Sequence, residues 1–117
     1  MDESILSTIK RLLGGNIEGD YFDDELIIDI NSVLSILTQL GVGPKDGFVI
    51  TKDGEEDWES YIGDRKDIEM VKTYIYAKVR LMFDPPSNSF LVDSMKKLCD
   101  EFEWRLNVAI ETPANQE

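Results

Sequence analysis

The sequence predicts an all-α fold: a small bundle of four main helices and one short helix, with a long β-prone loop or small hairpin at about residues 47–54. Apolar residues recur at three- and four-residue intervals, which is the spacing of amphipathic helices. Glycine and proline cluster in a few short segments that interrupt this spacing. The 117 residues, 42% of them hydrophobic, are enough for one buried core. We therefore expect one helical domain over residues 1–111 and a mobile tail at 112–117, which contains Pro113.

The first two predicted helices are separated by a glycine pair. Apolar side chains recur on one helical face over residues 2–13, and Gly14-Gly15 ends this helix. Asp20 or Asp23 can cap the second helix, because a carboxylate accepts hydrogen bonds from the free amides of a first turn. Gly41 supplies the stop of the second helix. Its apolar seam follows a 4-3-4-3 spacing through Leu26, Ile30, Val33, Leu37 and Leu40.

A glycine-rich segment follows. Residues 41–54 hold four of the eight glycines, and Asp53-Gly54 is a turn signal. A short helix carrying Trp58 and Tyr61 is expected over residues 55–62. Apolar residues on a short, marginally stable β-prone run prefer a partner, and the alternative is that the loop folds back onto its own bundle. We expect the loop to contact a neighbouring subunit or another protein through Phe48, Val49 and Ile50.

The last two predicted helices differ in how many sides are apolar. The helix over residues 67–83 has two apolar stripes, which indicates burial on both sides, and Asp84-Pro85-Pro86 ends it. Ser87, Asn88 or Ser89 caps a final helix that extends to about Glu111. The core face of this helix is expected to be Leu91, Met95, Leu98, Phe102, Leu106 and Ile110. Trp104 lies outside that face and, with Arg105 beside it, is a candidate interface residue.

The charge of the chain excludes some partners. Lys and Arg total 12 against 24 Asp and Glu, a net charge of −12, which argues against binding a phosphate backbone or an anionic membrane surface. Over residues 65–83 the balance reverses, with five cations against two carboxylates. These cations either pair with acidic groups, within the chain or between subunits, or form a DNA-facing stripe. They are Arg65, Lys66, Lys72, Lys78 and Arg80.

The sequence contains no recognisable catalytic constellation. It has no histidine, and Cys99 is a single thiol beside an apolar helix face, where we expect it to be buried. Gly41-Val42-Gly43 lacks the third glycine of a dinucleotide-binding turn. The carboxylates at residues 20–25 lack the ligand spacing of an EF-hand. The acidic run at residues 53–57 is expected to be a solvated loop, and the alternative is weak binding of a divalent cation. We expect no enzymatic activity and no cofactor, and the sequence shows neither a signal peptide nor a membrane-spanning run.

Several segments together resemble one protein family. Residues 71–86, with their Asp-Pro-Pro stop, resemble the central helix of tailed-bacteriophage head–tail connector proteins, and residues 103–108 resemble their last helix. Residues 31–33 and 39–43 resemble their second helix and its glycine exit. The resemblance covers the chain from about Ile5 to Val108, in the order of the family.

This resemblance implies a structural adaptor in the neck of a long-tailed phage or prophage, present in the host cytoplasm before assembly. Such proteins form a ring beneath the portal protein and receive a head-closure or tail-side protein. They are sometimes called DNA-packaging proteins, although they carry no ATPase of their own. The resemblance also implicates the C-terminal helix, with Trp104, in portal binding. Two alternatives remain: an acidic inhibitor that mimics nucleic acid and blocks a host DNA-binding enzyme, and a small terminase-type DNA recogniser, which the charge disfavours.

A ring through which genomic DNA passes should not hold the phosphate backbone tightly. We therefore expect an acidic lumen, drawn from Asp53, Glu55, Glu56 and Asp57. The cations of residues 65–83 should then lie in ion pairs or between subunits. The alternative is that the acidic charge keeps the free subunit soluble.

Overall fold

The computed structural model describes residues 3–14, 19–63 and 65–115, and side chains through residue 108. The chain forms five helices, which confirms the predicted all-α fold: α1 (Ile5–Leu13), α2 (Asp23–Gln39), α3 (Trp58–Ile62), α4 (Ile68–Phe83) and α5 (Ser89–Asn115). Among the described residues the β-prone segment contains no strand; an isolated bridge joins Ser4 and Asp57. The segment at 47–54 is therefore a loop and not a hairpin.

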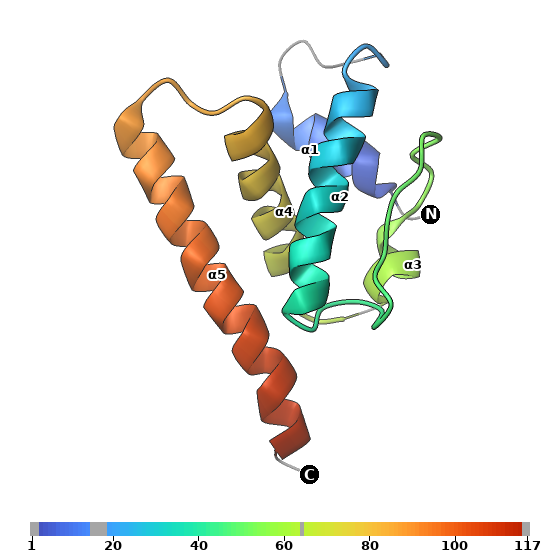
Figure 1. Ribbon diagram of the computed structural model, residues 1–117, viewed down its shortest axis with the longest axis vertical. Coiled ribbons are helices and arrows are strands. Elements are labelled where there is room, and N and C mark those ends of the chain that lie inside the picture. Colours follow the sequence, from blue (N-terminus) through green and yellow to red (C-terminus); the bar gives the residue numbers. More distant parts are fainter. Residues whose placement is uncertain (1–2, 15–18, 64, 116–117) are drawn as a thin grey trace.

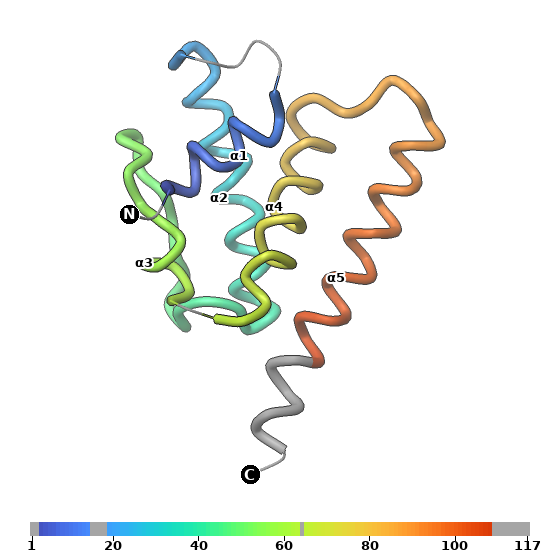
Figure 2. Tube along the Cα trace, turned by 180° about the vertical axis from the view of Figure 1, so that it is seen from behind, coloured from blue at the N-terminus to red at the C-terminus, as the bar shows by residue number. Residues whose placement is uncertain are grey.

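Helix α4 is the centre of the bundle. Helices α1, α2 and α5 all pack against it, as Figures 1 and 2 show from opposite sides. Its buried side chains occupy more than one face, as its two apolar stripes predict: Val71, Tyr74, Ile75, Ala77 and Val79. Met82, at the C-terminal end of one apolar stripe of this helix, is 47% exposed, because it lies in the last turn of α4, where the chain leaves toward α5.

The ends of α1 and α2 are stabilised by different interactions. Ser4 caps α1, since its side chain accepts a hydrogen bond from the backbone N–H of Ser7 at 3.0 Å. The expected carboxylate cap of α2 is wrong: Phe22 precedes the helix, and no side chain caps it. The carboxylate of Asp23 instead accepts a hydrogen bond from Lys10 Nζ at 2.8 Å, which ties α2 to α1. Gly41 follows α2 with a φ of 92°, a left-handed conformation that favours glycine.

Helix α5 is longer than expected and less covered. Asn88 caps it, with Oδ1 accepting from the Phe90 N–H at 2.8 Å, and the helix ends at Asn115 instead of near Glu111. The mobility of residues 112–117 stays a prediction. Of the expected core face, Leu106 is buried, whereas Leu91 and Leu98 are 49% and 37% exposed. Helix α5 starts at a distance from α4 and converges on it further along (Figures 1 and 2), so its first turns lack a cover. The side chain of Ile110 lies outside the described residues.

Candidate assembly surfaces

The loop between α2 and α3 is fastened to α2 by one side chain. The Asn31 amide donates to the Ile50 carbonyl at 3.0 Å and accepts from the Ile50 N–H at 2.8 Å. The Ile50 side chain enters the core and is 2% exposed. Both backbone polar groups of Ile50 are thus satisfied without a sheet. Ile50, expected at an interface with another protein, is a core residue of this chain.

The two other apolar residues of the loop are placed differently. The ring of Phe48 packs against Tyr61, with centroids 5.0 Å apart, and is half-buried. Val49 is 61% exposed and stands at the rim of an open groove of about 480 Å³ between α2 and the loop. The loop therefore folds back onto its own bundle, and Val49 is the one member of the trio that is exposed. The α2 wall of the groove is formed by Asn31, Ser35, Thr38 and Gln39.

The four acidic residues predicted to line a lumen divide into two pairs. Asp53 and Glu55 are exposed. Glu56 accepts hydrogen bonds from the Thr51 N–H at 3.1 Å and from its hydroxyl at 2.7 Å. Partial burial raises the pKa of Glu56, but these bonds outweigh it and the net shift is downward. Asp57 caps α3 by accepting from the Ser60 N–H at 2.8 Å, which lowers its pKa. Glu56 and Asp57 therefore shape the loop, while Asp53 and Glu55 carry its free charge.

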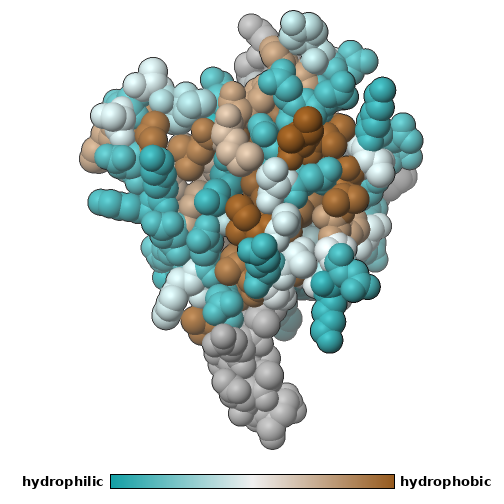
Figure 3. Space-filling view, viewed as in Figure 1, coloured by the Kyte–Doolittle hydropathy of each residue, from teal (hydrophilic) through white to brown (hydrophobic). Residues whose placement is uncertain are grey.

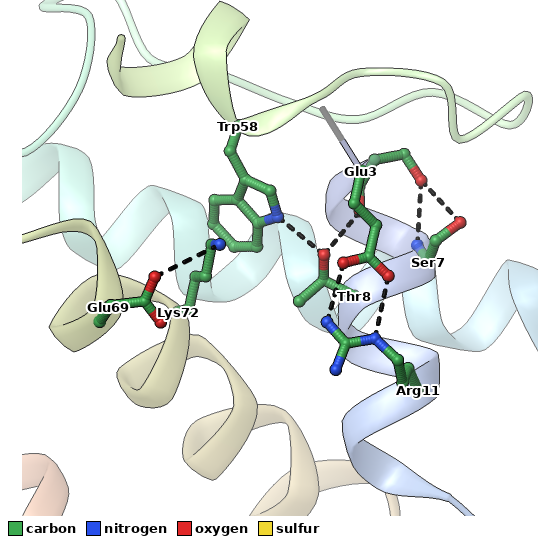
Figure 4. Close-up of polar contacts among 8 residues, drawn as sticks. Glu3, Ser7, Thr8, Arg11, Trp58, Glu69 and Lys72 are labelled. Carbon is green, nitrogen blue, oxygen red and sulfur yellow. Dashed lines mark hydrogen bonds and ion pairs between the residues drawn. The ribbon is translucent and has the colours of Figure 1, made fainter. Parts of the chain in front are cut away.

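The far end of the loop is fastened to α1 and α4 through Trp58 (Figure 4). Its indole N–H donates to the Thr8 hydroxyl at 2.8 Å, and the ring is 3% exposed. Lys72 Nζ lies 5.4 Å from the centroid of that ring and 3.7 Å from a Glu69 oxygen. Nearby on α1, Arg11 pairs with Glu3 at 2.8 Å. The loop is thus held near its middle by the part-buried bonds between Asn31 and Ile50, and at its C-terminal end by the buried bond between Trp58 and Thr8.

The cations of residues 65–83 are largely engaged within the chain. Arg65 pairs with Asp67, Lys72 with Glu69, and Lys78 with Glu103. Arg80 donates to the Tyr76 hydroxyl at 3.2 Å, and Lys66 is exposed. The interpretation of these residues as internal ion pairs therefore holds for three of the five.

The contact between α4 and α5 contains a polar group of three residues. The Tyr74 hydroxyl donates to a Glu103 oxygen at 2.7 Å, and Lys78 Nζ lies 3.3 Å from the same atom. Burial and the bond to Glu103 raise the pKa of Tyr74. Cys99 lies in this contact, is 2% exposed, and has a pKa raised by burial, which confirms the predicted buried thiol. This half of α5 is its anchored half.

The candidate interface residues of α5 lie on its outer side. Trp104 is 66% exposed, as expected from its place outside the apolar face. Arg105 is also exposed and pairs with Glu101 at 2.7 Å, one turn earlier. The sequence reasoning missed two other exposed apolar residues: Ile28 on α2 is 65% exposed and Phe90 on α5 is 74% exposed. Both lie outside the apolar seam of their helix, the same signal that identified Trp104.

These features define a class of protein. The described residues form a helical bundle whose large apolar side chains remain exposed on α2, α5 and the loop, as in proteins that act by assembly. Among these residues there is no group of three or more potential metal ligands, and no helix that is long and apolar enough to cross a membrane.

Comparison with known families identifies the class more closely. Residues 5–113 match the family described as phage connector protein, and the chain therefore belongs to that family. It is a bacteriophage head–tail connector protein, and the family is structural and not enzymatic. Neither the comparison with curated proteins nor that with solved structures found a match.

Proposed function

We propose that this connector protein assembles as a ring beneath the portal protein and joins the DNA-filled head to a head-closure or tail-side protein. It would act as a structural adaptor in the virion neck and occupy the host cytoplasm before assembly. The observation that carries the proposal is α5. Cys99 and Leu106 on one side of this helix are buried, whereas Trp104 on its outer side is 66% exposed. The described part of α5 therefore keeps a large apolar side chain available for a partner.

The portal contact is assigned to the outer side of α5. Trp104 combines a large apolar area with high exposure, which is the character of residues that dominate binding energy. Arg105 lies next to it and can exchange its intrahelical carboxylate for one on a partner. Val49, on the groove rim, is assigned to the tail-side protein.

Binding to the portal ring encoded by the same phage tests this proposal. Trp104→Ala should weaken co-sedimentation with the portal by at least tenfold, since a buried interface tryptophan contributes about 2 kcal/mol or more. Tyr21→Ala is the matched control, because Tyr21 is an aromatic residue that is 84% exposed near the start of α2. Equal binding by Trp104→Ala and the wild-type chain would contradict the assignment of Trp104. Absence of portal binding by the wild-type chain would contradict the proposed function.

The exposed acidic residues support an assembly that lets DNA pass without holding it. Asp53 and Glu55 project from the loop, and three of the five cations of residues 65–83 are already paired. We assign the part of the loop that carries Asp53 and Glu55 to the lumen, where negative charge repels phosphates over about 10 Å at 0.1 M salt. Tight, salt-sensitive binding of duplex DNA by the protein would contradict this assignment.

A further inference from the structure

The exposed side of α2 forms a continuous outer stripe that leads into the groove beside the loop. Its residues recur at three- and four-residue intervals, opposite the buried seam of the helix. The stripe is about 23 Å long, since an α-helix rises 1.5 Å per residue. Its last two residues also line the groove of about 480 Å³ whose rim carries Val49. The outer stripe consists of Asp24, Ile28, Ser32, Ser35 and Gln39.

Two apolar side chains stand out on this surface. Ile28 on the outer stripe is 65% exposed, and Val49 at the groove rim is 61% exposed. Between Ile28 and the groove lies the small side chain of Ser32, over which another chain can approach the helix closely. Figure 3 shows apolar atoms interrupting the hydrophilic surface over α2. Two exposed apolar side chains joined by a shallow stretch are typical of a surface that a partner covers.

The first half of the outer stripe is acidic. Asp24 and Glu25 are exposed one turn before Ile28, and α2 contains no Lys or Arg. Burial, and then the charge of Glu25, raise the pKa of Asp29, which indicates repulsion that a cation would relieve. The chain offers little relief of its own, because Lys10 of α1 is already paired with Asp23 at 2.8 Å. The complementary partner of this surface is therefore positively charged.

A second copy of this chain does not carry the complementary charge. Its net charge is −12, and six of its 12 Lys and Arg residues lie in ion pairs within the described part of the chain. Each of the others has an acidic residue within four positions along the chain. Nucleic acid is repelled by the same carboxylates. The charges therefore indicate a different, basic protein.

The position of the outer stripe separates it from the surface assigned to the portal. Helix α4 packs against both α2 and α5 and lies between them in both views (Figures 1 and 2). Trp104, assigned to the portal, is on α5. The outer stripe instead continues into the groove, whose rim residue Val49 is assigned to the tail-side protein. One partner can thus cover the stripe and the groove together.

We propose that the outer stripe of α2 and the adjoining groove bind a positively charged segment of the tail-side protein. Cations of that segment lie beside Asp24 and Glu25, and an apolar side chain packs on Ile28. The segment then crosses Ser32 and enters the groove against Val49. The inference rests on the proposed function and specifies the charge of the tail-side partner and the surface that it meets.

Binding to the tail-side protein encoded by the same phage tests the inference. It is measured at low and high salt, by calorimetry with the full chain alone and by co-sedimentation with the chain on its portal ring. Asp24→Lys/Glu25→Lys reverses the charge of the outer stripe. The matched control is Asp93→Lys/Asp100→Lys, which makes the same change in net charge at exposed positions of α5. Circular dichroism checks that each variant keeps its helical content.

A second pair of variants tests the surface without changing its charge. Ser32→Trp places a bulky side chain on the outer stripe, and Ser94→Trp places the same side chain at an exposed position of α5. Both the charge reversal on α2 and Ser32→Trp should weaken binding to the tail-side protein at least about tenfold. The charge reversal should also reduce the salt dependence of binding. The two α5 variants should change binding by less than about threefold.

Several outcomes would overturn the inference: equal losses in the α2 and α5 variants, tighter binding after charge reversal on α2, or unchanged binding by Ser32→Trp. Loss of self-association in the α2 variants, with tail-side binding intact, would assign this surface to a second copy instead. A wild-type chain that does not bind the tail-side protein, alone or on the portal ring, contradicts the proposed function. Equal binding by the wild-type chain and both α2 variants overturns only the surface inferred here.

Discussion

Two regions of the molecule differ from what their sequences predict. The loop between α2 and α3 is fixed to the core, whereas the first half of α5 is exposed. The loop is rich in glycine and has no regular structure, yet Asn31 holds Ile50 near its middle and Trp58 holds its C-terminal end against the core. Helix α5 is regular and has an apolar face, yet Leu91 and Leu98 of that face are exposed. A few side-chain hydrogen bonds therefore fix the irregular backbone of the loop, whereas the first half of α5 keeps an exposed apolar face. For a protein that acts by assembly, the regular element is the better candidate for binding.

The largest expected difference in folding stability is between alanine variants of the two tryptophans. Trp58→Ala should destabilise the fold by about 3–5 kcal/mol, because it empties a buried site and leaves the Thr8 hydroxyl without its donor. Trp104→Ala should change the free energy of unfolding by less than about 0.5 kcal/mol, because the side chain is 66% exposed. Urea denaturation followed by circular dichroism measures both. Similar losses in the two variants would contradict the division of the molecule drawn above.

The fastening of the loop can be broken more selectively at Asn31. Asn31→Ala should cost about 1–3 kcal/mol, because the backbone N–H and carbonyl of Ile50 lose their partner while Ile50 remains buried. Hydrogen exchange at the Ile50 amide should accelerate more than exchange in α4. Ser35→Ala, on the same wall of the groove, is the control. Unchanged exchange at Ile50 would show that the loop does not depend on this side chain.

The hydroxyl of Tyr61 allows a test of whether the packing of α3 against the loop can be made more stable. Its hydroxyl is buried, and within the described part of the chain it has no hydrogen-bond partner. Tyr61→Phe should therefore keep the ring contact with Phe48 and stabilise the protein by about 1 kcal/mol. Thermal unfolding would show the gain as a higher midpoint. A clear loss of stability would reveal a bond to this hydroxyl.

The smallest expected effect concerns the carboxylates of α2. The folded pKa of Asp29 is raised by burial and by Glu25, so its ionised form destabilises the fold above that pKa and the penalty disappears as the pH falls through it. Asp29→Asn should raise stability at neutral pH slightly, by less than about 0.5 kcal/mol, since the site is largely solvated. The gain should vanish at acidic pH. Denaturant titrations at the two pH values provide the measurement, and a gain of equal size at both would exclude the charge as its cause.

The helices and their order could be predicted from the sequence because apolar spacing and glycine or proline stops act locally. The burial of Cys99 and the exposure of Trp104 followed from helix geometry for the same reason. The placement of Ile50 could not be predicted, because it depends on Asn31, nineteen residues earlier. The exposure of Leu91 and Leu98 was missed for a related reason. Periodicity identifies which face of a helix is apolar, but not whether a neighbour is long enough to cover it.

The central position of α4 also has a consequence for how the molecule opens. Helices α1 and α2 contact each other as well as α4, whereas α5 is joined to the bundle mainly through α4. Segments with few buried contacts open at lower free energy than the core that carries them. The exposed first turns of α5 should therefore fray before the half that buried Cys99 and Leu106 hold in the bundle. The start of α5 can thus change its position as neighbours join, while the second half of the helix keeps its contact with α4.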